Sequence, residues 1–368
     1  MKEMKALREY IDGLIESGIP YIDVICYRDG ELICREMAGE GVRGDEKLFI
    51  YSCTKPITAA VMMRLIEEGK LSLDDLVEKY IPEFADVYLL EDGVKKKPKM
   101  KPKVSNLITM TAGITYNLNG YPFAEAVKNR GERSVTVAAM SAIPSMPLAR
   151  EVGERFDYSL CHDVLGAVME VAAGESFSSL VSRYILEPLG MKNTRFSAGL
   201  DESVTDFYRA DADGNVTLFA KQNEFALFEG FESGGAGLVS TVEDYSKFAD
   251  MLARGGLSRE GVRVLSEESV RDMRTPRIIS ASVGGNYTCI QGREYGYGLG
   301  VRVRMVETEW GLPLGEFGWD GAAGSYLMVD PERRVSVFIG MNVRNWPTVM
   351  EGKHLEIVKR IYSDLKLS

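Results

Sequence analysis

Two residues three positions apart, Ser52 and Lys55, have the types and spacing needed for nucleophilic chemistry. Apolar residues recur at helical spacing over 57–66 and Gly69 follows, which predicts a helix that begins close to the serine. Residues three apart share one helix face, and a helix N-terminus adds a positive potential. We therefore expect Ser52 to be a nucleophile and Lys55 its base, a role that requires burial or a nearby cation to lower the pKa of the lysine.

The spacing alone does not establish this site. Ser-x-x-Lys fixes only two residues, and 363–366 is a second copy near the C-terminus. His162 and His354 are the two histidines of the chain, so a histidine-rich zinc site is not expected. The sequence also lacks His-Glu-x-x-His, Gly-x-Ser-x-Gly, a Walker lysine loop and Gly-x-Gly-x-x-Gly. A hydrolase built from this chain would activate its nucleophile without histidine, and we predict no metal and no cofactor.

Composition narrows the classes of partner. The 368 residues are enough for a large core, and the net charge of −10 argues against nucleic acid or an anionic membrane as a partner. Six lysines between 95 and 103 are the local exception, and they indicate a solvated hairpin or loop. We expect a small-molecule substrate. No pattern in the sequence indicates an oligomeric state.

The chain is expected in the cytoplasm. Its five cysteines are an odd number without a C-x-x-C pair, which is typical of free thiols in a reducing compartment. No apolar run approaches the length of a membrane span. The first residues, 4–15, have the pattern of an amphipathic helix and not of a secretion leader.

The order of predicted elements indicates an α/β (α+β) fold. Asp29-Gly30 between two β-rich runs predicts an antiparallel hairpin, and the period of two returns near the C-terminus. We expect one antiparallel sheet built from both termini and flanked by helices, 1–75 and 246–368, with an inserted, mainly helical subdomain, 76–245, and an active site between them. The expected C-terminal strands are 297–306, 323–329 and 334–341; the expected helices include 157–173, 176–186, one from 241 to 254 and one at about 348–365; a further hairpin turn is expected at Asp213-Gly214.

Three motifs in this order resemble those of the serine β-lactamase and penicillin-binding-protein superfamily. They are Ser52-Cys53-Thr54-Lys55, then 156–160 with Tyr158, then 317–324 with Trp319-Asp320-Gly321. The sequence is most similar to the class C and family VIII esterase branch. Further matching stretches cover nearly the whole chain: 73–75, 80–84, 107–113, 187–191 and 234–241.

The resemblance implies a role for each motif. Ser52 would be acylated, with Lys55 as its proton partner. Tyr158 would act as general base and then protonate the leaving group, helped toward the phenolate by the lysine charge. The backbone N–H groups of Ser52 and Ala322 would form the oxyanion hole. Gly321 would let the substrate lie close to the third-motif strand.

Departures from the family pattern bear on the substrate. Leu160 stands where β-lactamases and cell-wall peptidases have Asn, and Trp319 where they have Lys. Losing these polar groups favours an uncharged, more hydrophobic acyl substrate. Two further residues have alternative interpretations: Arg344 would supply a cation or be a solvated strand-end residue, and His162 would tune Tyr158 or a polar group of the substrate, or be a buried core histidine.

The sequence therefore predicts a serine hydrolase that forms an acyl-enzyme with a small ester or amide, most similar to a carboxylesterase. One alternative is a β-lactamase or D-Ala-D-Ala carboxypeptidase. The other is a non-catalytic binding module of the same fold.

Overall fold

A seven-stranded antiparallel sheet joins the two ends of the chain. The structure, a computed structural model, describes residues 4–279, 294–344 and 352–367. The strand order is β10-β11-β12-β13-β14-β1-β2, so the N-terminal hairpin continues the C-terminal strands through the β1–β14 pair. This confirms the predicted α/β fold with a sheet from both termini. The strands are β1 Tyr21–Arg28, β2 Glu31–Gly39, β10 Tyr295–Tyr297, β11 Arg302–Arg304, β12 Phe317–Asp320, β13 Tyr326–Asp330 and β14 Val335–Met341.

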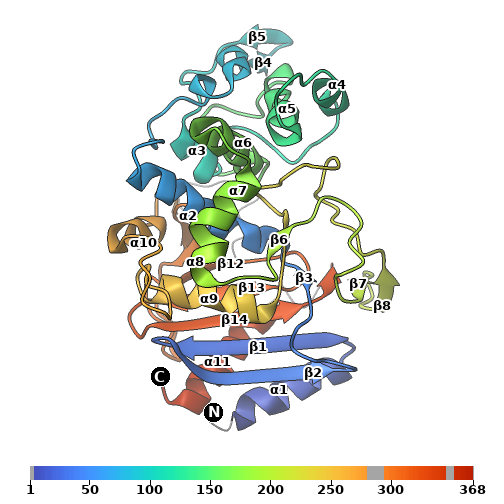
Figure 1. The fold of residues 1–368 in the computed structure, drawn as a ribbon, viewed down its shortest axis with the longest axis vertical. Coiled ribbons are helices and arrows are strands. Elements are labelled where there is room, and N and C mark those ends of the chain that lie inside the picture. Colours follow the sequence, from blue (N-terminus) through green and yellow to red (C-terminus); the bar gives the residue numbers. More distant parts are fainter. Residues whose placement is uncertain (1–3, 280–293, 345–351, 368) are drawn as a thin grey trace.

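Helices cover both faces of this sheet (Figure 1). On the outer face, α1 (Lys5–Glu16) and α11 (His354–Leu365) pack together and bury alternate strand residues such as Val24 and Val337. On the inner face, α9 (Val242–Ala253) packs against β14 and β1 and buries the intervening residues, such as Phe338. The alternation of side chains along each strand thus feeds two separate cores.

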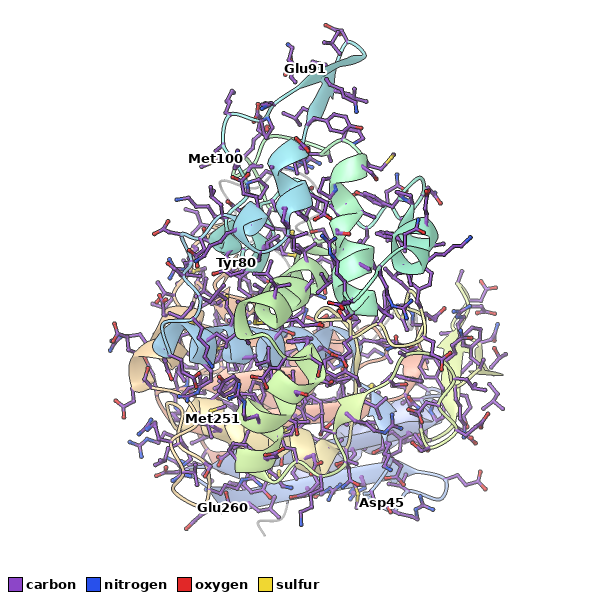
Figure 2. The ribbon with its side chains drawn as sticks, turned by 45° about the horizontal axis from the view of Figure 1, so that its top comes forward. Asp45, Tyr80, Glu91, Met100, Met251 and Glu260 are labelled. Carbon is purple, nitrogen blue, oxygen red and sulfur yellow. The ribbon has the colours of Figure 1, made fainter. Side chains whose placement is uncertain are left out.

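The middle of the chain forms the helical half above the sheet in Figure 1. There α2 (Thr54–Glu67) contacts α6 (Cys161–Ala173), and the hairpin of β4 and β5 projects at the end of the molecule, with Glu91 near its tip in Figure 2. The remaining helices are α3 Val104–Ile108, α4 Phe123–Lys128, α5 Val135–Ser141, α7 Phe177–Val181, α8 Glu187–Leu189 and α10 Glu267–Met273, with short 3₁₀ or π turns at 51–53, 77–79, 82–86, 143–145 and 182–186.

The remaining strands that the structure describes form three small sheets. The hairpin consists of β4 Leu89–Glu91 and β5 Val94–Lys96. One three-stranded sheet has the order β3 Leu48–Phe49, β9 Leu238–Ser240, β6 Arg195–Phe196, and the other has the order β15 Val343–Arg344, β7 Phe207–Ala210, β8 Val216–Phe219.

Several predicted turns and caps are confirmed. Asp29 and Gly30 have φ of 50° and 86°, as a tight hairpin turn requires. The hairpin around Asp213-Gly214 forms between β7 and β8. Ser176 and Thr241 both cap helices by accepting a backbone N–H through the side chain.

Three boundaries were predicted wrongly. The strand expected at 323–329 begins only at Tyr326. The expected strand 297–306 is two strands, because the chain turns back between them: a Cβ at Gly298 would lie 2.2 Å from the Met273 carbonyl oxygen, and Gly300 has φ of 77°. The expected helix 157–173 begins only at Cys161, so Tyr158 lies in the turn before it. The predicted start of the last helix, at about 348, lies outside the described residues.

The division into 1–75 with 246–368 and 76–245 stays a prediction. Two elements near its second boundary contact the N-terminal and C-terminal parts of the chain: β9 pairs with β3, and α9, which begins at Val242, packs on the sheet.

Within the described ranges, no single helix has the length and apolar character needed to cross a membrane. One pair of helices, Cys161–Ala173 and Phe177–Leu189, has the necessary length and composition only when taken together, and it is bent by 84°.

Candidate active site

Ser52 lies in a 3₁₀ turn immediately before α2, next to a residue with unusual backbone geometry. Tyr51 has φ of 42°, the left-handed region that a bulky residue rarely adopts. Its fully buried ring stacks on Phe49 at 5.6 Å and meets the edge of Phe225 at 5.0 Å between centroids. This packing holds the turn that presents the half-buried serine.

Lys55 is fully buried, as its predicted role requires, and its ammonium nitrogen has three hydrogen-bond acceptors. Nζ lies 3.2 Å from Ser52 Oγ, 2.8 Å from the Gly235 carbonyl oxygen and 3.4 Å from Tyr116 Oη. These contacts fix the lysine nitrogen beside the serine hydroxyl.

A buried carboxylate supports this arrangement from α6. Asp163 accepts hydrogen bonds from Ser233 Oγ at 2.5 Å and from the Gly235 N–H at 3.3 Å, which orients the Gly235 carbonyl toward Lys55. Burial raises the pKa of the Asp163 carboxyl, and its hydrogen bond from Ser233 and the Lys55 charge oppose that rise. The burial that a basic amine requires is thus present, and the neighbouring group on α6 is a carboxyl group and not a second cation.

Tyr158 completes the predicted set. Its Oη lies 2.7 Å from Ser52 Oγ, and the Lys55 Nζ is 4.5 Å from the centroid of its ring. The indole N–H of Trp319, on β12, donates to Tyr158 Oη at 3.3 Å. The structure thus brings Ser52, Lys55 and Tyr158 together and adds a donor from the third motif.

The turn after β12 carries the predicted oxyanion donor. The Gly321 N–H donates to the Ser325 carbonyl at 2.7 Å, and Ser325 Oγ donates to the Ile50 carbonyl at 2.9 Å. These bonds tie the turn to the segment that leads into Ser52. Within the described ranges, the half-buried Ala322 N–H makes no hydrogen bond, so it is available to a ligand.

Gly321 is required by the packing of the turn after β12. A Cβ there would lie 2.1 Å from Ser325 Oγ and 2.3 Å from the Ile50 carbonyl oxygen. The position faces the protein interior, and glycine is required for the close approach of the turn to Ile50. That the absence of a side chain also lets a substrate lie close to the strand stays a prediction.

Three of the residues predicted to contact the substrate are packed against other parts of the protein. Leu160 is 4% exposed and packs in the core at the start of α6. Trp319 is 2% exposed, so its contact is with Tyr158 and a direct substrate contact is not supported. Arg344 pairs with Glu224 at 2.9 Å and lies over the Phe225 ring, which makes it part of the packing around Tyr51.

His162 is a buried core histidine. Its Nε2 lies 3.4 Å from the Ile108 carbonyl oxygen and 3.5 Å from Tyr297 Oη. Burial, together with the Lys55 charge, holds the pKa of His162 well below its usual range, so the ring is neutral. Of the two interpretations left open by the sequence, the contacts support the buried one.

Sequence reasoning missed Tyr116, Asp163 and Gly235. One signal was present: Asp163 lies in a mostly apolar helix, where an unpaired buried carboxylate would be costly. Tyr116 and Gly235 come close to Lys55 only in the folded chain, and no pattern in the sequence marks them.

A cavity of about 680 Å³ opens beside Tyr158, and we call it the Tyr158 cavity. Its lining comes from the loop after α3 and the loop before Tyr158: Thr115, Tyr116, Asn117, Asn119, Tyr121, Met146, Pro147, Ala149, Arg150, Asp157 and Tyr158. A volume of roughly 300–1,000 Å³ is typical of small-molecule sites. Over the ranges that the structure describes, no group of three or more His, Cys, Asp or Glu side chains could hold a metal ion.

The sequence matches the model of one protein family over nearly its whole length. The Beta-lactamase family model matches residues 7–359. The chain belongs to the β-lactamase family.

Named relatives place the chain within this superfamily. Protein Rv1367c of Mycobacterium tuberculosis is 30% identical over 348 residues, 89% of this chain and 86% of that protein. Esterase EstB of Burkholderia gladioli is 28% identical over 346 residues, 86% of this chain and 83% of the esterase. Among solved structures, EstCE1, described as a hydrolase with promiscuous acyltransferase activity, superposes with a TM-score of 0.78 at 25% identity and covers 98% of this chain and 99% of its own.

Proposed function

We propose that this protein is a serine hydrolase that cleaves a small carboxylic ester or amide through an acyl-enzyme on Ser52, with carboxylesterase activity. The observation that carries the proposal is the position of one oxygen: Ser52 Oγ lies within hydrogen-bond distance of both Tyr158 Oη and Lys55 Nζ. The likeness to EstB and EstCE1 supports the same activity.

Proton transfer in this site proceeds through Tyr158. In the resting site both Lys55 Nζ and Tyr158 Oη donate to Ser52 Oγ. Once Tyr158 has lost its proton, its phenolate oxygen, 2.7 Å away, accepts the proton of the serine. The Trp319 N–H and the Lys55 charge both favour that oxygen as an acceptor, since each stabilises its negative form. Lys55 thus acts as a fixed positive charge and Tyr158 as the base.

The reaction then follows acyl transfer in two halves. Ser52 Oγ attacks the ester carbonyl carbon, and the N–H groups of Ser52 and Ala322 bind the developing oxyanion. A donor in such a position is commonly worth about 10²-fold or more in rate. The C–O bond of the ester breaks as Tyr158 returns the proton to the leaving oxygen. Tyr158 then accepts a proton from water, whose oxygen attacks the acyl carbon. The bond to Ser52 Oγ breaks as Tyr158 returns that proton to it, which releases the acid and free Ser52.

A β-lactamase or D-Ala-D-Ala carboxypeptidase is the second candidate. In the superfamily that the sequence resembles, both kinds of enzyme have a lysine in the third motif that would pair with a carboxylate of the substrate. Trp319 occupies that position here. Its indole is buried against Tyr158. This favours the esterase.

A substrate panel separates these candidates. p-Nitrophenyl butyrate, a p-nitroanilide of the same acid, nitrocefin and a D-Ala-D-Ala peptide are compared on wild type and Ser52→Ala. The proposal expects the ester to be turned over fastest, with loss of turnover in the variant. Faster hydrolysis of nitrocefin or of the peptide would favour the second candidate, and turnover that survives Ser52→Ala would reject the serine mechanism.

We also propose a reducing compartment, the cytoplasm, for this protein. The cysteines within the described ranges, Cys26, Cys34, Cys53 and Cys161, are all free and buried. Cell fractionation tests this, with recovery outside the cytoplasm as the contrary result.

A further inference from the structure

The Tyr158 cavity contains a charged side chain that the mechanism above does not use. Arg150 lies in its wall, and its Nη2 donates to Asp157 Oδ1 at 3.1 Å while Nε also donates to the same carboxylate. Within the described ranges, the third guanidinium nitrogen, Nη1, has no hydrogen-bond partner. The side chain is 27% exposed, so this nitrogen is available to a bound molecule.

Arg150 is the basic residue of the cavity lining. Asp157 is the acidic residue of the cavity lining, and it is shared between two cations, because Arg155 also lies 3.6 Å from it. One carboxylate is therefore shared by two guanidiniums. Asp157 is nearly buried, with 5% exposure, which keeps the Arg150 guanidinium in place.

The rest of the lining suits a flat, polar group. The Tyr116 and Tyr158 rings lie 5.5 Å apart between centroids, and Tyr121 adds a third ring. Asn117 and Asn119 add amide groups. Tyrosine rings offer apolar contact area with hydrogen-bonding ends.

We propose that Arg150 binds a carboxylate of the substrate, so that the preferred substrates are acidic esters or amides. This inference rests on the proposed function and deepens it. Arginine forms strong, directional bonds to carboxylates, which are about twice as strong as neutral hydrogen bonds. It also revises the expectation from Leu160 and Trp319 of an uncharged substrate, because the cation absent from β12 is supplied by the loop before Tyr158.

Two matched pairs of esters test the proposal and locate the carboxylate. One pair carries it in the acyl chain: p-nitrophenyl hemiglutarate against p-nitrophenyl valerate. The other carries it on the leaving group: 4-(butyryloxy)benzoate against 4-(butyryloxy)benzamide. The proposal expects wild type to prefer the anionic member of one pair by about tenfold in kcat/KM. A preference for the neutral member in both pairs would overturn it.

Variants assign the preference to one side chain. Arg150→Gln is expected to abolish the preference while leaving the neutral ester turned over, and Arg150→Lys to retain part of it. Arg133→Gln is the matched control, because Arg133 pairs with Glu83 in the same half of the molecule and lies outside the cavity lining. An unchanged preference in Arg150→Gln would overturn the proposal.

A measurement on wild type avoids dependence on the folding of a variant. The proposal expects 4-hydroxybenzoate or glutarate to inhibit hydrolysis of p-nitrophenyl butyrate more strongly than the corresponding amides, and the difference to shrink in 0.5 M NaCl. Equal inhibition by acid and amide would contradict it. Turnover of neutral esters through Ser52 without any anionic preference would reject this inference alone, whereas no turnover and no Ser52 adduct would reject the proposed function as well.

Discussion

Two buried charged clusters adjoin β12, and they are built differently. The serine cluster, Ser52, Lys55, Tyr158, Asp163 and Trp319, is connected by hydrogen bonds of 2.5–3.4 Å through Gly235, Tyr116 and Ser233. The arginine cluster, Arg302, Arg304, Glu316 and Asp320, is connected mainly by ion pairs of 3.5–3.8 Å.

The difference indicates separate roles for the two clusters. Within the described ranges, Arg302 Nη1 and both Glu316 carboxylate oxygens make no hydrogen bond. Long ion pairs attract without fixing atoms, so the arginine cluster is suited to hold strands together. The serine cluster fixes each atom that has to exchange a proton. Variants in the serine cluster should therefore change catalysis, and variants in the arginine cluster should change stability.

The largest effect is expected at the base. Tyr158→Phe removes the oxygen 2.7 Å from Ser52 Oγ and should lower kcat/KM for p-nitrophenyl butyrate by about 10³-fold without lowering Tm. Tyr362→Phe is the matched control, because that hydroxyl bonds Asp330 at the outer face of the sheet. A Tyr158→Phe variant with the kcat/KM of wild type would contradict the catalytic role of the serine cluster.

A change in the arginine cluster should act on stability. Arg302→Gln removes the positive charge that pairs with the buried carboxyl groups of Glu316 and Asp320. The free energy of unfolding should fall by about 3–5 kcal/mol. Thermal unfolding should show a Tm lower by roughly 5–10 °C. The kcat/KM per folded molecule should stay within about threefold of wild type. A variant with normal Tm and lost activity would contradict the assignment.

A smaller effect is expected from the donor to Tyr158. Trp319→Phe removes the indole N–H 3.3 Å from Tyr158 Oη and should lower kcat/KM by about tenfold at neutral pH. The acid limb of the pH profile should move to higher pH, because the phenolate loses a hydrogen bond. Trp310→Phe, in the outer core, is the control. A uniform loss across the pH range would instead indicate altered packing.

The smallest effect concerns His354, which is buried with Nε2 3.0 Å from the Gly324 carbonyl oxygen. Burial lowers the pKa of His354 to about 3. The folded state keeps this ring neutral while the unfolded chain binds a proton below its usual pKa of about 6.5, so stability falls as pH falls, by up to about 1.4 kcal/mol per unit. Urea unfolding from pH 7 to 5 should show a shallower fall for His354→Gln than for wild type. Equal slopes would contradict a neutral His354.

Local patterns in the sequence predicted local structure well. Asp29-Gly30 predicted its hairpin, and the spacing of 57–66 predicted α2, because turns and amphipathic helices depend on neighbouring residues. The bond between Asp163 and the Gly235 N–H spans 72 positions and exists only after the segment that precedes β9 packs against α6. The reason for Gly321 likewise depends on Ile50, which lies far away in the chain.

The candidate site shows the same division. Ser52, Lys55 and Tyr158 were found because they belong to motifs with fixed spacing. Arg150 belongs to no such motif, and its exposure to the Tyr158 cavity depends on how two loops fold. Side-chain direction also escaped prediction: Trp319 is buried against Tyr158 where a substrate contact was expected.

The most direct test of the central claim is peptide mapping by mass spectrometry after reaction with a fluorophosphonate probe. The account predicts a single adduct on Ser52 in folded wild type, much slower labelling in Tyr158→Phe, and no adduct in Ser52→Ala or after denaturation. Labelling at another residue, or equally fast labelling of Ser52 in Tyr158→Phe, would contradict it.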